Sequence, residues 1–345
     1  MAVTVVAELA AEAGVFTVVA GRLVRLAGGR AWVLWLLVVV FAVLSTAFLS
    51  LDTTAVLLTP VVVLLARHAG LPPLLFAMTT VWLANTASLV LPVSNLTNLL
   101  ALHVLHFSDA GRWLALLGPA ALVAVVVPCA VLAILFRRDL RARFARMPPE
   151  PVEDRALLIA ASVVVVALLP LLVSGLPPWL PACAAAVALA AIFLLRGRRL
   201  RFGMLPWRLV LFAAALFLVV GILQSLGSTA ALAVVTGRGD DPLSLLRLAG
   251  SGLVGANAAD NLPAYLALEP VAGSPARIAA LLIGVNAGPL ITPWASLATL
   301  LWHSRLTALG VELRWRRYVL LGAIAAPLTV AAATAVLALS PTVGR

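Results

Sequence analysis

The chain alternates long apolar runs with short polar stretches, and the runs have the length of membrane-spanning helices. Continuous apolar runs occupy about 3–20, 113–136, 156–173, 179–195, 207–227 and 318–339. Each is close to the roughly 20 residues that cross a bilayer as an α-helix. Lipid offers the backbone no hydrogen-bond partner, so a helix is the expected conformation of every run. The pattern predicts an all-α polytopic membrane protein.

Two further apolar segments, residues 31–67 and 242–275, are each interrupted near the centre by a short polar stretch. Two apolar arms around a polar tip are typical of a re-entrant helical hairpin. Aligning Asp52 with Asn261 pairs LDTTAVLL with DNLPAYLA, in the same order along the chain. We therefore expect one hairpin in each half of the chain. The predicted tips hold Asp52 and Thr53 in the first hairpin, and Asp260 and Asn261 in the second.

A repeat relates two other interrupted segments. Residues 85–100 (NTASLVLPVSNLTNLL) and 286–301 (NAGPLITPWASLATLL) align without a gap, and Pro92 coincides with Pro293. A proline inside an apolar segment frees backbone carbonyls that lipid cannot satisfy, so each segment must break beside a polar cavity. Paired breaks in corresponding halves are typical of the binding site of a secondary transporter. The candidate binding residues are Asn85, Ser94, Asn95, Thr97 and Asn98 in the first copy, and Asn286, Thr292, Ser296 and Thr299 in the second.

These side chains are hydroxyls and amides, which suit a small hydroxylated solute. A half-helix that starts near Pro92 also directs free N–H groups into the gap, where they can hold an anion. Freed carbonyls on the other half-helix can hold a cation. The alternative is that both prolines only kink packed helices whose polar side chains join their neighbours. Recurrence at matching positions favours the binding site.

Composition and charge support a membrane location. The chain is 63% hydrophobic and 11% charged with a mean hydropathy of +1.14, so a water-soluble fold could not cover its surface with polar groups. The net charge of +11 comes from arginines in short loops between apolar runs, which excludes a nucleic-acid interface as its explanation. Cys129 and Cys183 lie in apolar runs without metal-ligand spacing, so we expect buried core residues, no metal and no cofactor.

The arginines also predict the topology. If the first hairpin enters from the cytoplasm, the loops that fall inside hold 19 of the 24 arginines. The second hairpin then enters from the opposite side, as inverted repeats require. We expect a first inverted repeat at 1–136, an arginine-rich cytoplasmic linker at 137–155 and a second repeat at 156–345. The first repeat lacks the counterparts of two leading helices, so the protein is either a shortened form or begins upstream.

The carboxylates at the predicted hairpin tips are the candidates for proton coupling. An ionised carboxylate inside a membrane is costly unless it is paired, hydrated or protonated, so Asp52 and Asp260 are functional candidates. They can titrate during transport, or they can remain ionised and cap the half-helices. An aspartyl dyad at opposed tips would instead make an intramembrane protease. A channel would require a continuous polar face, whereas the sequence has isolated polar breaks. We expect a carrier and not an enzyme.

Four motifs resemble the arsenical pump membrane proteins of the ion transporter superfamily. They are FLSLDTTAVLLTPVVV at 48–63, LPVSNLTNLLAL at 91–102, DNLPAYLAL at 260–268 and GVNAGPLITPWASLATLLW at 284–302. The resemblance implies an inner-membrane exporter of arsenite or antimonite that uses the proton motive force or an ATPase subunit. It also implies that Asp52, Ser94, Asn95, Thr97, Asn98 and Asn261 lie at motif positions. Leu51 and Asp260 depart from the pattern, since the family usually has asparagine at both.

Substrate chemistry favours the arsenite interpretation. Arsenite is mostly a neutral trihydroxide at neutral pH, and no basic residue lies near the predicted breaks, whereas a dicarboxylate would need its charges offset. A sodium/proton antiporter, or another ion or anion carrier of the same superfamily, is the alternative. The expected partners are a small inorganic solute, a coupling ion (H+ or Na+) and the lipid bilayer of a prokaryotic cytoplasmic membrane. An ATPase subunit and a second copy of the chain are the candidate protein partners.

Overall fold

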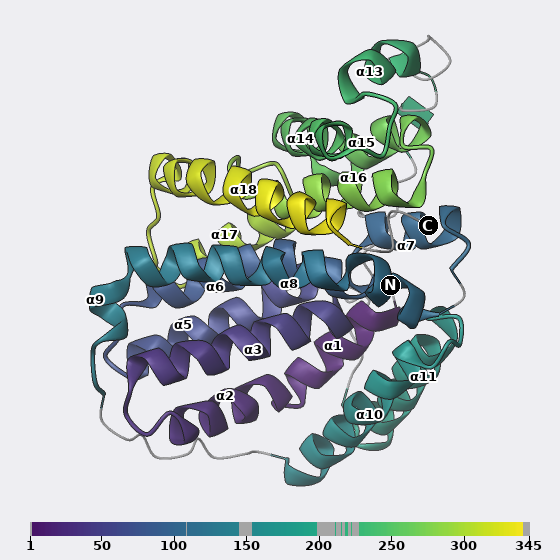
Figure 1. The fold of residues 1–345 in the computed structure, drawn as a ribbon. Helices are drawn as coiled ribbons and strands as arrows, with labels where there is room; N and C mark the ends of the chain where they lie inside the picture. The colour runs from purple at the N-terminus through teal and green to yellow at the C-terminus, as the bar shows by residue number, and fades with distance from the viewer. Residues whose placement is uncertain are drawn as a thin grey trace. The chain divides into compact units, whose positions relative to one another are not determined.

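The structure is a computed structural model that describes residues 2–107, 109–144, 154–198 and 228–340, with a few isolated residues between 211 and 222. In this part of the chain the regular elements are helices (Figure 1). Six helices are long and apolar enough to cross a membrane, or seven spans if one bent pair is counted. The predicted all-α membrane fold is confirmed. The helix expected at 207–227 lies almost entirely outside the described residues.

The first expected helix is bent rather than continuous. α1 (Ala2–Glu12) and α2 (Val15–Leu26) meet at an angle of 63°. Between them Gly14 has a φ of +83°, a left-handed conformation that an α-helix cannot contain and that glycine adopts without a steric penalty. The prediction of one ordinary helix at 3–20 was therefore wrong, because the apolar pattern continues through the glycine while the backbone does not.

The chain forms two compact units, each with its own core. Unit 1 comprises Met1–Ala84, Leu132–Pro206 and Leu301–Val311, and unit 2 comprises Asn85–Val131, Trp207–Leu300 and Glu312–Arg345. Both units take segments from both halves of the sequence. The division into inverted repeats at 1–136 and 156–345 stays a prediction.

Unit 1 packs its helices through apolar faces and a few buried hydrogen bonds. The Trp35 indole donates to Thr79 Oγ1 at 2.8 Å, and the Trp302 indole donates to the Ala77 carbonyl at 2.9 Å. Its further helices are α3 (Ala31–Leu49), α5 (Thr59–His68), α6 (Pro73–Thr86), α9 (Arg137–Leu140), α10 (Arg155–Val173) and α11 (Trp179–Leu195), with the end of α17 (Leu297–Ala308). α10 and α11 lie side by side (Figure 1), and α1 contacts both.

The expected burial of the two cysteines is not found. Cys183 on α11 is exposed, and Cys129 on α8 (Ala110–Leu135) is only partly buried. In a membrane helix an apolar position can face lipid as well as protein, so an apolar run does not indicate which side is buried.

The first predicted hairpin has its break at Ser50. α3 ends there, and α4 (Leu51–Thr53), a π-helical turn at Thr54–Leu58 and α5 follow. The Thr54 hydroxyl donates to Ser45 Oγ at 2.9 Å and accepts from the Thr46 hydroxyl at 3.2 Å, so the chain folds back on α3. By length and composition each arm is itself a candidate span, so re-entry without crossing stays a prediction.

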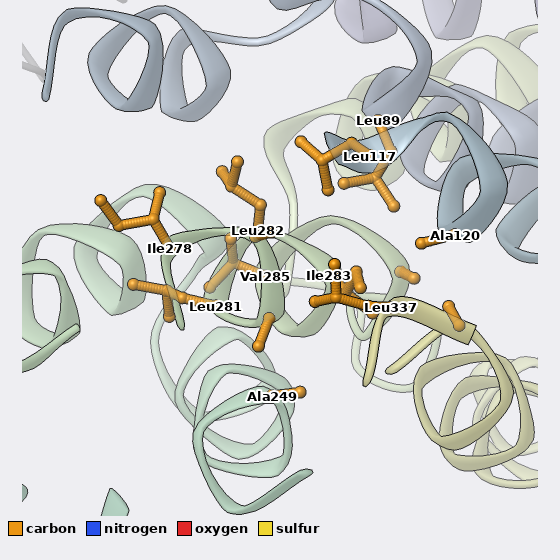
Figure 2. Close-up of a cluster of buried hydrophobic side chains, with 14 of the residues drawn as sticks. Leu89, Leu117, Ala120, Ala249, Ile278, Leu281, Leu282, Ile283, Val285 and Leu337 are labelled. Atoms are coloured by element: carbon orange, nitrogen blue, oxygen red, sulfur yellow. The ribbon is translucent and has the colours of Figure 1, made fainter. Parts of the chain in front are cut away.

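Unit 2 is built around α16 (Pro275–Ala287), which is buried along its whole length from Ala276 onward. Figure 2 shows Leu281, Leu282 and Ile283 of this helix in the apolar core. A helix that is apolar on every side is expected to lie at the centre of a bundle. The surrounding elements include α7 (Leu96–Val104), α8, α13 (Ser228–Thr236), α14 (Pro242–Ala258), α15 (Asn261–Leu268), the 3-10 turn Glu269–Val271 and α18 (Trp315–Ala338).

Both proline-containing segments are broken, as predicted. After α6 the first segment continues as the 3-10 turns Ala87–Val90 and Pro92–Ser94, and α7 begins only at Leu96. In the second segment α16 ends at Ala287 and α17 begins at Leu297, so Pro293 lies in nine residues without a regular helix. The second hairpin is likewise interrupted, at Ala259 and Asp260 between α14 and α15.

Candidate functional site

A buried network of amides in unit 2 joins the two broken segments. Asn286, at the end of α16, accepts through its Oδ1 from Asn95 Nδ2 at 2.5 Å and from the Thr97 hydroxyl at 3.2 Å. Its Nδ2 donates to Asn98 Oδ1 at 2.7 Å. All four side chains are buried. The structure therefore brings together predicted site residues that are nearly 200 positions apart in the sequence.

Inside the first break, side chains satisfy the carbonyls that the proline frees. Asn98 Nδ2 donates to the carbonyls of Ser88 at 2.7 Å and Leu91 at 3.2 Å, and the Ser94 hydroxyl contacts the same two carbonyls. Asn95 is extended and caps α7 by accepting from the Thr97 N–H at 3.4 Å. These bonds stabilise the broken conformation, because a buried carbonyl without a partner is unfavourable by about 1–3 kcal/mol.

The second break is fixed by Asn257 of α14, a residue that the sequence patterns did not single out. Asn257 Oδ1 accepts from the Thr292 N–H at 2.9 Å, and Asn257 Nδ2 donates to the Gly288 carbonyl at 2.9 Å. Its backbone carbonyl accepts from the Thr292 hydroxyl at 2.9 Å and from the Trp294 indole at 2.8 Å. The one signal that could have found it is an amide close to the predicted tip of the second hairpin.

The tip of the second hairpin also contacts the second break. The Asn261 N–H donates to the Ala295 carbonyl at 3.0 Å, and the Asn261 side chain is buried. Asp260 Oδ1 accepts from the Leu262 N–H at 3.0 Å and so caps α15. The tip is thus attached to the break through its backbone.

Several hydroxyls near the second break are buried. The Ser296 hydroxyl has no hydrogen-bond partner in the described part of the chain. Thr299 lies beside the Tyr318 phenol. Asn85, the predicted counterpart of Asn286, is fully buried at the end of α6. Among the residues that the structure describes, the Ser296 and Thr299 hydroxyls are not partners of Asn286.

The other two predicted site residues, Asp52 and Thr53, belong to unit 1. Ser50 accepts from the Thr53 N–H at 3.3 Å, and its hydroxyl donates to Thr53 Oγ1 at 3.0 Å, so Ser50 caps α4 and Asp52 does not. By capping role, Ser50 in the first hairpin is therefore the equivalent of Asp260 in the second. In each hairpin the helix begins directly after its cap, so aligning the caps pairs Leu51 with Asn261. The sequence alignment paired Asp52 with Asn261 and is therefore shifted by one residue.

A buried arginine, which the sequence analysis did not single out, holds the base of the second hairpin. The guanidinium of Arg277 donates to the carbonyls of Ala272 at 2.7 Å, Gly237 at 2.7 Å and Gly239 at 2.9 Å. It thereby joins the chain before α14 to the chain after α15. Asp241 caps α14 at the same base, and hydrogen bonds from Ser244, first of all its hydroxyl, lower the pKa of this carboxyl.

Comparisons with known proteins agree with a membrane-transporter fold. The family described as Citrate transporter matches residues 1–299. An arsenical pump membrane protein of Yersinia enterocolitica is 30% identical over 350 residues, which cover 94% of this chain and 81% of that protein. The arsenical pump membrane protein of Escherichia coli (strain K12) is 30% identical over 351 residues, with the same coverage.

A solved structure is similar as well. The crystal structure of the Alcanivorax borkumensis YdaH transporter has a TM-score of 0.62 to this chain at 17% identity, and the match covers 99% of this chain and 85% of that one. At this identity the likeness shows the fold alone.

Broken membrane helices around a buried polar network define a polytopic membrane transporter. The chain belongs to the family of citrate transporters and arsenical pump membrane proteins. The resemblance stated from the four motifs is confirmed, and so is the expected multi-pass location in a bacterial cytoplasmic membrane.

Proposed function

We propose that the protein exports arsenite or antimonite across the cytoplasmic membrane as a secondary carrier driven by the proton motive force. The observation that carries the proposal is the chemistry of the Asn286 network. Its hydrogen-bonding groups are amides, a hydroxyl and backbone carbonyls, and they are uncharged. The relatives named arsenical pump membrane proteins support the same substrate class.

A neutral network suits a neutral cargo. Arsenite at neutral pH is mostly a trihydroxide, and each hydroxyl group both donates and accepts a hydrogen bond. An asparagine amide does the same through Oδ1 and Nδ2. A citrate ion would carry several negative charges into a buried site, which is unfavourable unless basic side chains or a metal ion compensate for them.

Binding would require rearrangement of the network, because Asn286 already has three partners. A hydroxylated solute can replace these partners one for one, so the amides need not be left unsatisfied in either state. This exchange offers a way to couple occupancy of the site to the relative position of the two broken segments. We propose in addition that residues 1–136 and 156–345 form the two inverted repeats of this carrier.

The test is export in an arsenite-sensitive bacterial host. Cells that express the protein should accumulate several-fold less arsenite than cells with an empty vector, and a protonophore should abolish the difference. Citrate is the substrate named in the family's description, so citrate uptake is measured in the same cells. Equal arsenite accumulation with and without membrane-inserted protein would overturn the assignment, and citrate uptake in its place would identify an organic-acid carrier.

A further inference from the structure

A groove with mostly apolar walls lies between the second break and the first turns of α18. Its volume is about 730 Å³. The apolar side chains that line it are Pro293, Trp294, Leu300, Trp315, Val319 and Leu320. Trp294, Leu300 and Leu320 are exposed. Because α18 is a candidate membrane span, an exposed apolar surface on it faces the hydrocarbon of the bilayer.

One end of the groove is basic. Arg316 lines it, and Arg314 and Arg317 lie within two residues at the start of α18. The side chains of Arg314 and Arg316 are exposed. The N-terminus of a helix adds a partial positive charge at the same place. Arg316 and Leu320 are four residues apart and lie on one face of α18, so the groove changes from cationic to apolar along the helix axis.

We propose that this groove binds an anionic phospholipid. The phosphate would contact Arg316 at the membrane interface, where Trp315 is a typical anchor, and an acyl chain would extend along Leu320 and Trp294. Basic pockets between membrane helices bind anionic head groups in this way, and each arginine near the surface contributes about 1 kcal/mol. The charge complementarity favours a lipid over a second copy of this chain, whose matching surface would have to carry negative charge.

Bound lipid would contact the transport machinery directly. Trp294, which would contact the acyl chain, donates its indole N–H to the Asn257 carbonyl at 2.8 Å. Asn257 in turn holds Thr292 and Gly288 of the second break. A lipid in the groove would therefore stabilise the break in its present conformation. Binding itself does not depend on the identity of the transported solute.

The test is lipid retention by the purified full-length protein, measured by native mass spectrometry. Dioleoylphosphatidylglycerol should be retained over dioleoylphosphatidylcholine, and Arg316→Gln should weaken this preference ~5-fold, as loss of one phosphate contact predicts. Arg247→Gln removes an exposed arginine from α14 and should leave the preference unchanged. Leu320→Asn should reduce retention of both lipids, and glycerol phosphate without acyl chains should not compete.

Equal retention of the two lipids by the wild type would overturn the proposal, as would equal losses in Arg316→Gln and Arg247→Gln. Displacement by glycerol phosphate would assign the basic end to a soluble phosphate instead. A dimer that protects Trp294 from an aqueous quencher in lipid-free detergent would assign the groove to a second copy of the chain. Each substituted side chain is exposed, so correct folding is expected in all variants and is checked by thermal unfolding.

Discussion

At the scale of single residues, Asn286 is the side chain that joins the two broken segments of the candidate site. Asn286→Ala should remove the partner of the Asn95 amide and one partner each of the Thr97 hydroxyl and Asn98 Oδ1. A buried polar group that loses its partner destabilises the fold by about 1–3 kcal/mol, less where water enters. We expect a lower unfolding temperature in detergent together with loss of arsenite export.

The control for this variant is Thr307→Ala, which removes an exposed hydroxyl that donates to the His303 carbonyl. Asn286→Asp tests whether the donor group of Asn286 is needed for export. A carboxylate keeps the acceptor oxygen but cannot donate to Asn98 Oδ1. Wild-type export by both Asn286 variants would show that the network is not part of the transport site.

Ser50 is a second position with a specific expectation, because its backbone is strained. Its φ of 98° and ψ of 158° lie in a region that is essentially restricted to glycine and that is unfavourable by about 1–3 kcal/mol for other residues. Ser50→Gly should remove the strain, and glycine as a helix cap is only a few tenths of a kcal/mol less favourable than serine. Ser50→Ala loses the cap and keeps the strain.

We therefore expect Ser50→Gly to unfold at a higher temperature than Ser50→Ala, by a difference of roughly 1–3 kcal/mol in unfolding free energy. Thermal unfolding of the two variants in the same detergent measures it directly. An equal stability of the glycine and alanine variants would contradict a strained backbone at the hairpin tip.

The sequence identified the network residues but not their pairing. Asn95, Asn98 and Asn286 are found because a proline and polar side chains recur at matching positions. Asn257 and Arg277 were missed, since each is a single polar residue without a counterpart in the repeat. Their importance comes from carbonyls that only the folded backbone brings within reach, and no local pattern encodes such contacts.

At the scale of elements, the helices α14 and α16 pack with their backbones in close contact. A Cβ atom added to Gly284 would lie 2.2 Å from the Ala249 carbonyl oxygen, whereas one added to Gly250 would meet nothing within 4 Å. Such small residues allow membrane helices to approach closely. Gly284→Ala should therefore destabilise the protein by about 1–3 kcal/mol through overpacking.

The matched control is Gly250→Ala on α14, which should be neutral or slightly stabilising because alanine has the higher helix propensity. Thermal unfolding of the two variants and the wild type provides the comparison. If Gly284→Ala and Gly250→Ala unfold at the same temperature, the close approach of α14 and α16 is not as described.

The base of the second hairpin gives another expectation at this scale. Arg277→Gln leaves the carbonyls of Gly237, Gly239 and Ala272 without a charged donor, and hydrogen bonds to charged groups contribute about 1.5–3 kcal/mol each. We expect faster proteolysis in the loop at 237–241, which Arg277 holds. Arg247→Gln also removes one positive charge but should leave the proteolysis rate at the wild-type value.

The broken elements could be predicted because their cause is local. Proline within an apolar run disrupts helical hydrogen bonding, and this is visible in the sequence. The bend after α1 could not be predicted in the same way, because glycine is tolerated in many membrane helices and only the observed left-handed conformation of Gly14 identifies a break.

At the scale of the whole molecule, hydrophobic runs were sufficient to predict a polytopic membrane protein. The compact units were not predictable from that pattern, because each is assembled from distant segments of the chain. Hydropathy reports which segments enter the membrane. It carries little information on which helices pack together, since lipid and protein interiors are similarly apolar.

Coupling to protons is a property of the whole transport cycle, and the two hairpin carboxylates differ in their suitability for it. Asp260 is engaged in capping α15 through the Leu262 N–H. In the first hairpin Ser50 is the cap, and Asp52 lies within a candidate span. An ionised carboxylate inside a membrane is unfavourable unless it is compensated, so Asp52 is the better candidate to bind a proton during the cycle.

Asp52→Asn should therefore transport without responding to a pH gradient. In everted vesicles with an acidic lumen, arsenite uptake by this variant should fall to the rate measured without a gradient, while exchange of arsenite for arsenite continues. Asp260→Asn should keep its response to the gradient, because its amide oxygen can still cap α15. Uptake that is driven by the gradient to the same extent in both variants and the wild type would exclude coupling through either carboxylate. In that case the driving ion must bind elsewhere in the transport cycle.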